Sequence, residues 1–289
     1  MSVYKKSTEQ NMYAQEWHKI EKKKPSPSNY RKLISIDHKE FVDKILEQKP
    51  KFINSIVESI YNGDLYILKN AISKENIEKL IDEVYEFSHT RPSSFHKMLE
   101  GVPNFHRWID EESAGKYSIR SVKHATYIFP WNKEMSKAKK IVMDATRPLK
   151  FLAGLSIYEF ENNTPKDKIV ERLQVVRYPP GGYIEPHADN NKNIRLVISG
   201  YLTKRGKGYQ NGGFFLVDEK NGKLDMEKEI DAGDVGFFYP TLGHGLERID
   251  PEEKAVYDSK KGRWWFGLDM VNSDVVDELK RNTSSPYNT

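Results

Sequence analysis

Hydrophobic residues follow a helical period through much of the first half of the chain. From Phe41 onward, after a polar stretch, apolar residues recur at intervals of three and four. Pro50 is expected to divide this region into two helices, because proline cannot donate the hydrogen bond of a helix interior. Further elements predicted before residue 150 are a strand at 65–68, a helix capped by Ser73, a strand at 119–130 and a helix at 133–148.

The pattern changes after Val170, where short runs of β-forming residues alternate with Gly, Asn and Asp turns. The spacing predicts eight strands without intervening helices, at 171–178, 183–188, 194–202, 213–218, 228–231, 235–239, 244–249 and 263–271. Strands of this length and spacing are typical of a closed barrel or a double-sheet jelly roll. We therefore predict an α+β protein with a β core over 171–271. The irregular stretch at 88–118 is expected to be a lid or binding loop.

Composition removes several function classes. The chain has no cysteine, which excludes disulfides, thiolate metal sites and a cysteine nucleophile. No segment approaches the roughly 20 apolar residues of a membrane span, and no signal-like run begins the chain, so a cytoplasmic location is expected. The net charge of the whole chain is +4. The first 33 residues contain eight basic and three acidic residues, so the rest of the chain is close to neutral. We expect residues 1–33 to be a basic, flexible lead-in to a single domain at 34–289, and nucleic-acid attraction is the less favoured alternative.

Two histidines and an aspartate form the candidate chemical centre. His187 and Asp189 lie two residues apart at the end of the strand predicted at 183–188, and in extended chain their side chains point to the same face. His244 follows the hydrophobic strand at 235–239 and a second turn. Two imidazoles and one carboxylate make up the facial triad of non-haem Fe(II) oxygenases. A carboxylate-bearing co-substrate would also need a cation, for which Arg263 is favoured and Arg248, four residues after His244, is the alternative.

The order of these motifs carries a family resemblance. The matching pieces are Tyr178, Gly181, the run His187-Ala-Asp189-Asn190, Arg195, Gly212-Gly213-Phe214, Ala232-Gly233-Asp234, His244 and Arg263. This set resembles the catalytic core of the Fe(II)/2-oxoglutarate-dependent dioxygenases, closest to their prolyl-4-hydroxylase-like branch. The resemblance implies a double-stranded β-helix (jelly-roll) core at 171–271 with an N-terminal helical support and lid layer at 34–170.

The resemblance also assigns roles to residues. It implies that His187, Asp189 and His244 bind Fe(II), and that Arg263 binds the C5 carboxylate of 2-oxoglutarate. Tyr178 is expected to line the co-substrate pocket, O2 is the second co-substrate, and Arg195 is expected to be structural. One departure is that His244 and Arg263 are nineteen residues apart, further than the family usually places them. We interpret residues 251–262 as a hairpin insertion, and Arg248 becomes the better candidate if that interpretation is wrong.

The activity implied is hydroxylation of an unactivated C–H bond, with release of succinate and CO2. A small-molecule substrate of natural-product, amino-acid or sugar type is favoured, because no recognition module accompanies the domain. A prolyl-type peptide hydroxylase, a nucleic-acid demethylase and a non-catalytic metal-binding barrel remain alternatives, and a cupin is disfavoured because Asp189 stands where a second histidine belongs. His89, His96 and His106 are expected at the surface, and His124 is expected to be a satisfied core or surface histidine. The oligomeric state stays open.

Overall fold

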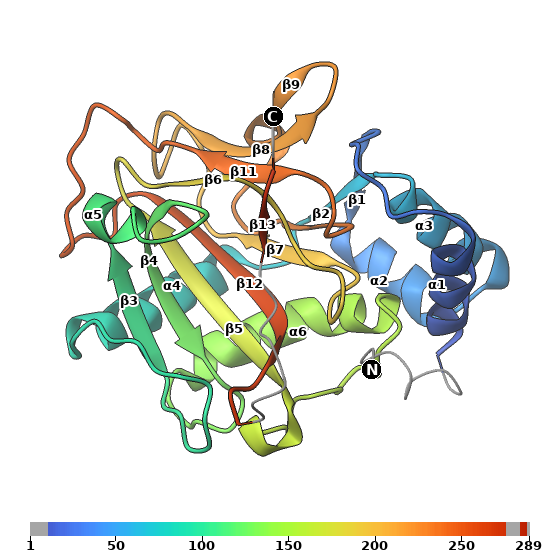
Figure 1. Cartoon of the computed structure of the whole chain (residues 1–289), viewed down its shortest axis with the longest axis horizontal. Helices are drawn as coiled ribbons and strands as arrows, with labels where there is room; N and C mark the ends of the chain where they lie inside the picture. Colours follow the sequence, from blue (N-terminus) through green and yellow to red (C-terminus); the bar gives the residue numbers. More distant parts are fainter. Residues whose placement is uncertain (1–10, 276–283, 288–289) are drawn as a thin grey trace.

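A layer of helices covers one face of a large β-sheet in this protein. The computed structural model describes residues 11–275 and 284–287. The helices are α1 (Met12–Lys23), α2 (His38–Leu46), α3 (Pro50–Tyr61), α4 (Lys74–His89), α5 (Glu111–Ala114) and α6 (Ser136–Leu152). Figure 1 shows α4 and α6 behind the long strands, while α1, α2 and α3 gather beside them. None of the described helices is both long and apolar enough to cross a bilayer.

Local sequence signals explain where these helices begin and end. The Asp37 side chain accepts the first backbone N–H groups of α2, and Ser73 does the same for α4. Pro50 opens α3, where its missing N–H is not needed. Gly63 follows α3 with a φ of +93°, and a side chain there would collide with the Asn29 carbonyl. The predicted break at Pro50 and the Ser73 cap are confirmed.

The strands are β1 (Leu33–Asp37), β2 (Leu65–Lys69), β3 (Phe105–Ile109), β4 (Ser121–Ile128), β5 (Ile169–Tyr178), β6 (Tyr183–Ala188), β7 (Val197–Tyr201), β8 (Gly213–Asp218), β9 (Gly222–Asp225), β10 (Val235–Phe238), β11 (His244–Glu247), β12 (Arg263–Asn272) and β13 (Ser285–Pro286). From β5 to β12 the chain alternates between two sheets. The larger has the order β10-β7-β12-β5 and the smaller β6-β11-β8-β9, with antiparallel neighbours throughout. This alternation defines a double-stranded β-helix, and the predicted fold class is confirmed.

Additional strands widen the larger sheet on both sides. β2 joins it beside β10, and β1 pairs with β2 in parallel. At the opposite edge β4 pairs with β5 and β3 pairs with β4. The first residues of β4 also pair with β6, which links the two sheets at this edge.

The two faces of strand β12 contact different parts of the protein. Its alternate residues Trp264, Phe266, Leu268 and Met270 are buried in the core cluster that includes the helices. The residues between them face the opposite way, and Arg263, Trp265, Asp269 and Val271 line an internal cavity. The two-residue period of a strand produces this division.

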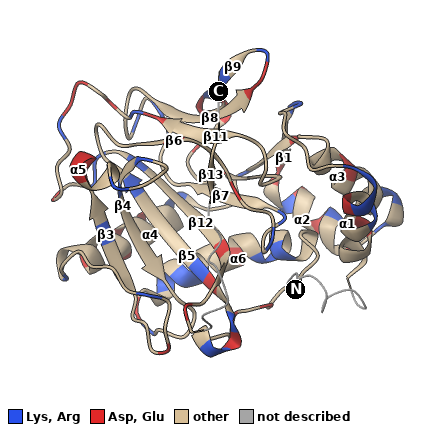
Figure 2. Cartoon of the chain, viewed as in Figure 1, with Lys and Arg blue, Asp and Glu red and all other residues tan. Residues whose placement is uncertain are grey.

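The N-terminal segment differs from the expected flexible lead-in. Residues 12–23 form α1, in which Tyr13, Ala14 and Trp17 are completely buried. The Trp17 indole N–H donates to the Leu152 carbonyl at 2.7 Å, and its ring lies 6.0 Å from that of Tyr239. Sequence inspection missed this helix because its buried residues occupy a narrow stripe among charged ones. In the view of Figure 2, Lys/Arg and Asp/Glu segments are interspersed over the helices and loops. Residues 1–10 lie outside the described part.

Three smaller predictions were wrong. The strand expected at 228–231 is replaced by β9 and a 3-10 turn at Glu227–Glu229. The stretch at 88–118 is not irregular throughout, because it contains β3 and α5, while its role as a lid or binding loop stays a prediction. Helix α6 continues past Pro148 to Leu152, and the fully buried Leu149 and Leu152 hold its last turn against the core.

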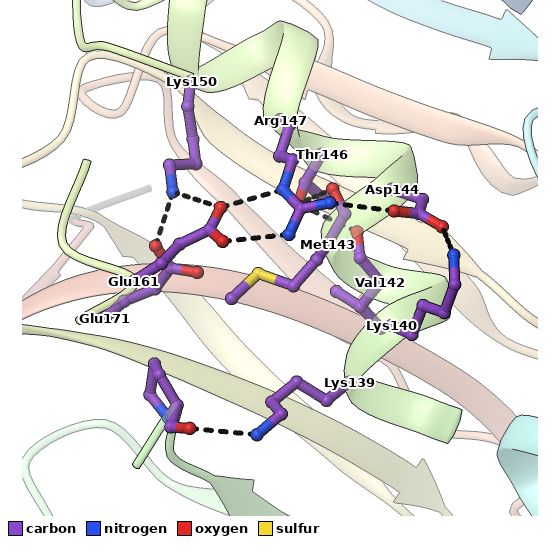
Figure 3. A network of polar contacts seen from close by, with 11 residues as sticks. Lys139, Lys140, Val142, Met143, Asp144, Thr146, Arg147, Lys150, Glu161 and Glu171 are labelled. Atoms are coloured by element: carbon purple, nitrogen blue, oxygen red, sulfur yellow. Dashed lines mark hydrogen bonds and ion pairs between the residues drawn. The ribbon is translucent and has the colours of Figure 1, made fainter. Parts of the chain in front are cut away.

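A buried polar network fixes α6 to the outer face of β5 (Figure 3). The Lys150 ammonium lies 2.7 Å from the Glu171 carboxylate and 3.3 Å from that of Glu161, which also pairs with Arg147. Lys150 is 1% exposed and Glu171 0% exposed. Burial raises the pKa of Glu171 to about 7 even though Lys150 acts in the opposite direction. In this buried setting, each charged group is therefore stabilised by the opposite charge of its partner.

Truncation of Trp17 tests whether α1 belongs to the folded core. We expect Trp17→Ala to lower the free energy of unfolding by about 3–5 kcal/mol, because a large buried ring is removed. The measurement is urea denaturation of the full chain. Lys22→Ala, at an exposed position of the same helix, should change stability by less than about 0.5 kcal/mol. Equal effects of the two variants would contradict the packing of α1.

The buried pair on α6 gives a second test. We expect Lys150→Met to destabilise the protein by about 3–5 kcal/mol, because Glu171 loses its cation in an apolar setting. The double variant Lys150→Met/Glu171→Leu should recover most of this loss. Lys140→Met removes an exposed pair with Asp144 on the same helix and should cost less than about 1 kcal/mol. A double variant as unstable as Lys150→Met would argue against the pairing.

Candidate metal centre

Two neighbouring strands of the smaller sheet bring the candidate triad together. His187 and His244 are directly opposite each other in the β6–β11 pairing, and their rings are 4.3 Å apart. Asp189 follows β6 by one residue. Its carboxylate oxygens lie 3.9 Å from His187 Nε2 and 3.7 Å from His244 Nε2. All three side chains can thus reach one point, and they form a group able to hold a metal ion.

Hydrogen bonds orient both imidazoles toward that point. His187 Nδ1 lies 2.8 Å from the Glu185 carbonyl, and His244 Nδ1 lies 3.0 Å from the Leu242 carbonyl. A carbonyl only accepts, so each Nδ1 carries the proton and each Nε2 keeps its lone pair. Burial and the neighbouring His244 lower the pKa of His187 to about 4, which keeps its ring neutral at pH 7. This donor set of nitrogen and carboxylate oxygen fits a divalent iron ion.

The C-terminal segment reaches the same site. Strand β13 pairs with Ala188 and His187 of β6, and the Ser284 hydroxyl donates to Asp189 Oδ1. The Tyr287 backbone N–H donates to the Pro186 carbonyl. Sequence inspection predicted no element here, since a two-residue strand has no period to detect.

The triad opens onto an internal cavity of about 280 Å³ between the two sheets. Its lining combines charged and polar side chains with aromatic and aliphatic ones. The charged and polar residues that line it include Lys123, Arg172, Tyr178, His187, Asp189, Ser199, Tyr201, His244, Arg263 and Asp269.

Arg263 lies in this cavity with a fixed guanidinium group. Its side chain is 3% exposed, and Nε and Nη2 contact the Glu227 carboxylate at 3.0 Å. Glu227 also accepts hydrogen bonds from the Tyr209 hydroxyl and, at 2.6 Å, from the Phe214 backbone N–H. Arg263 is therefore held in place by a carboxylate that is itself saturated with donors.

Two tyrosines line the cavity close to Arg263. Tyr178 is opposite Arg263 in the β5–β12 pairing, and the Arg263 guanidinium lies 5.5 Å from the Tyr201 ring centre. Burial raises the pKa of both phenols, so both remain protonated donors. The Tyr201 hydroxyl is buried and has no hydrogen-bond partner among the described residues. A cation beside an unpartnered hydroxyl fits the distal carboxylate of 2-oxoglutarate.

Arg248, the alternative cation, lies elsewhere. It follows β11, pairs with Glu111 and donates to the Gly181 carbonyl at 2.9 Å. Its guanidinium lies 4.1 Å from the centre of the Tyr183 ring, outside the cavity that contains the triad. Of the two arginines, only Arg263 shares a cavity with His187 and His244.

The remaining sequence predictions have mixed outcomes. Arg195 is buried and pairs with Glu21 of α1 at 2.8 Å, a structural contact as expected. His106 is buried, contrary to the expected surface position, and its Nδ1 lies 3.0 Å from Nε2 of the buried His124. His106 lies on β3 and His124 on β4. The pairing of these two strands was not predicted from the sequence.

The residues that sequence inspection missed are Glu227, Tyr201, Lys123, Arg172 and Asp269. For Lys123, Arg172, Tyr201 and Asp269, inward strand positions were the available signal, since each lies on a predicted strand. Glu227 gave no such signal.

Comparisons with known proteins identify similar structures only. No family model matches the sequence, and no curated protein matches it. A prolyl-4-hydroxylase from Pseudomonas putida has 12% identity and a TM-score of 0.42, over 74% of this chain and 95% of that chain. A full-length protein from Neurospora crassa, in complex with alpha-KG, has 12% identity and a TM-score of 0.45, over 82% and 83%. A 2OG-Fe(II) oxygenase family protein from Burkholderia pseudomallei has 10% identity and a TM-score of 0.42, over 84% and 94%. Likeness at this level carries no information on ligands or substrates.

Metal titration tests the candidate triad. We expect one Fe(II) per chain under nitrogen, and we expect His187→Ala or His244→Ala to weaken its binding by more than about 100-fold, since a direct ligand matters more than an outer hydrogen bond. Competition with a chelator of known affinity measures the loss. His96→Ala removes a histidine remote from the cavity and should bind iron normally. Unchanged affinity in both triad variants would exclude this site.

Proposed function

We propose that this protein is an Fe(II)- and 2-oxoglutarate-dependent oxygenase that hydroxylates an unactivated C–H bond of a small molecule. The observation that carries this proposal is the shared cavity of the His187, Asp189 and His244 donors with the fixed cation Arg263. Two imidazoles and one carboxylate occupy one side of a metal ion and leave its other positions to ligands. Arg263 supplies what a dicarboxylate co-substrate needs away from the metal.

Each residue of the site has a role in this reaction. His187 and His244 would present their Nε2 lone pairs to iron, and Asp189 would add one carboxylate oxygen. Arg263 would bind the C5 carboxylate of 2-oxoglutarate, with the Tyr201 hydroxyl as a further donor and Tyr178 as part of the wall. Glu227 would keep the Arg263 fork in place.

The bound iron and co-substrates supply the oxidation itself: 2-oxoglutarate and O2 become succinate and CO2, and one oxygen atom is inserted into the substrate C–H bond. The chain's own contribution is position and exclusion of water. The strands of both sheets surround the cavity, and Ser284 covers Asp189 from the C-terminal side. A cavity of about 280 Å³ favours a small molecule over a large partner.

The choice between Arg263 and Arg248 provides the decisive test. We expect Arg263→Lys to raise the Kd of 2-oxoglutarate by about 10-fold or more, because a lysine cannot reproduce the bidentate fork. The lysine keeps a positive charge beside Glu227, so the fold should survive. Arg248→Lys should leave the Kd unchanged. The measurements are calorimetry of the Fe(II)-loaded protein under nitrogen and succinate formation in air.

Iron affinity should be normal in both arginine variants. A defect confined to Arg248→Lys would transfer the co-substrate site to that residue. Absence of any 2-oxoglutarate binding by the iron-loaded wild-type protein would refute the proposed function.

A further inference from the structure

The cavity contains a second charged region, well separated from Arg263 along β12. Arg263 is opposite Tyr178 in the β5–β12 pairing, whereas Asp269 is opposite Arg172. Positions 263 and 269 of β12 are separated by roughly 20 Å of extended chain, at about 3.3 Å per residue. Both positions line the cavity, so it has charged groups at two ends. We call the group formed by Lys123, Arg172 and Asp269 the distal region.

Lys123 is a cation that forms no ion pair within the described part of the chain. It lies on β4, lines the cavity together with Tyr127 of the same strand, and is partly buried. Among the residues that the structure describes, none forms an ion pair or hydrogen bond with its ammonium group. Burial, followed by the nearby Arg172 and Arg107, lowers the pKa of Lys123 to about 8. The ammonium is thus still mostly protonated at pH 7, although its surroundings disfavour the charge.

Arg172 has a donor that the protein leaves unused. Its Nη2 donates to Asp269 Oδ2 at 2.8 Å, and Gln174 Nε2 donates to the same oxygen at 2.5 Å. The Nε of Arg172 is buried and has no hydrogen-bond partner among the described residues. Buried donors are paired in most structures, because an unpaired one loses its water without compensation. Arg172 also lines the cavity, so its guanidinium adds a second positive charge there.

We propose that the substrate is a small carboxylic acid whose carboxylate binds to Lys123 and Arg172 in the distal region. This inference rests on the proposed function. Lys123 and Arg172 carry two positive charges against the one negative charge of Asp269, and a carboxylate would neutralise the remainder. A phosphate monoester would bring a charge of about −1.5 to −2 and leave the region negative.

The distal region is also close to the candidate metal centre. Lys123, Arg172 and Asp269 line the same cavity as the three residues of the triad. A small acid held there would direct its carbon skeleton toward the open side of the triad. The cavity of about 280 Å³ must also hold 2-oxoglutarate, so the substrate occupies only part of it.

Matched acids and amides test this assignment. The probes are short amino acids and hydroxy acids, each paired with its amide, together with glycerol phosphate. Binding is measured by calorimetry on Fe(II)-loaded protein under nitrogen, with saturating 2-oxoglutarate so that acids cannot occupy the Arg263 end. We expect at least one acid to bind about 10-fold more tightly than its amide, a difference of about 1.4 kcal/mol. The same acid should stimulate succinate formation in air, and its amide should not.

Variants of Lys123 test whether this residue causes the preference for an acid over its amide. Lys123→Met is nearly isosteric and should abolish the preference for acid over amide, while Lys123→Arg should retain most of it. Lys51→Met removes an exposed lysine of α3 and should behave as wild type. Unchanged melting temperature and unchanged 2-oxoglutarate affinity in Lys123→Met would confirm that its fold and co-substrate end are intact.

Several results would overturn the assignment. They are a wild-type protein that binds no acid more tightly than its amide, a preference that survives in Lys123→Met, and tighter binding of glycerol phosphate than of any acid. Weaker 2-oxoglutarate binding in Lys123→Met would place Lys123 in the co-substrate site instead. In all four cases wild type still binds 2-oxoglutarate, so the proposed function would stand. Loss of that binding in wild type would refute the function itself.

Discussion

The pairing of β6 with β11 is the constraint on which the candidate site depends. It sets His187 opposite His244, and the register shifts between His244 and Leu246. A slip of one residue would turn an imidazole to the other face of the sheet. Each imidazole is further fixed by a carbonyl two residues earlier in the chain. The donor geometry is therefore set by backbone pairing before any metal binds.

The larger sheet supplies Arg263 and the distal region on the side of the cavity that faces this pair. Its strand β12 gives one set of side chains to the helical core and the alternate set to the cavity. Packing of Trp264 and Phe266 against the helical layer thus holds Arg263 and Asp269 in place on the other side. Stability and site geometry are coupled through the pleat of this strand.

Three buried charge pairs join distant parts of the chain, whereas Lys123 forms no such pair within the part that the structure describes. Lys150 with Glu171, Arg195 with Glu21 and Arg263 with Glu227 each join elements distant in sequence, and every pair combines both signs. Such pairs are costly to break but position their elements specifically. Lys123 has no partner of this kind among the described residues. This contrast is what directs attention to a ligand.

The sequence by itself determined the chemistry available and most of the elements. Residue types and period two identified His187, Asp189 and His244 as candidate ligands and predicted the jelly roll, because these signals are local. Only the tertiary structure shows that α1 packs in the core and that Arg263, not Arg248, shares the cavity with the triad. It alone also shows that Glu227 pairs with Arg263 and that Lys123 lines the cavity. These depend on contacts between residues far apart in the chain, which leave no period in the sequence.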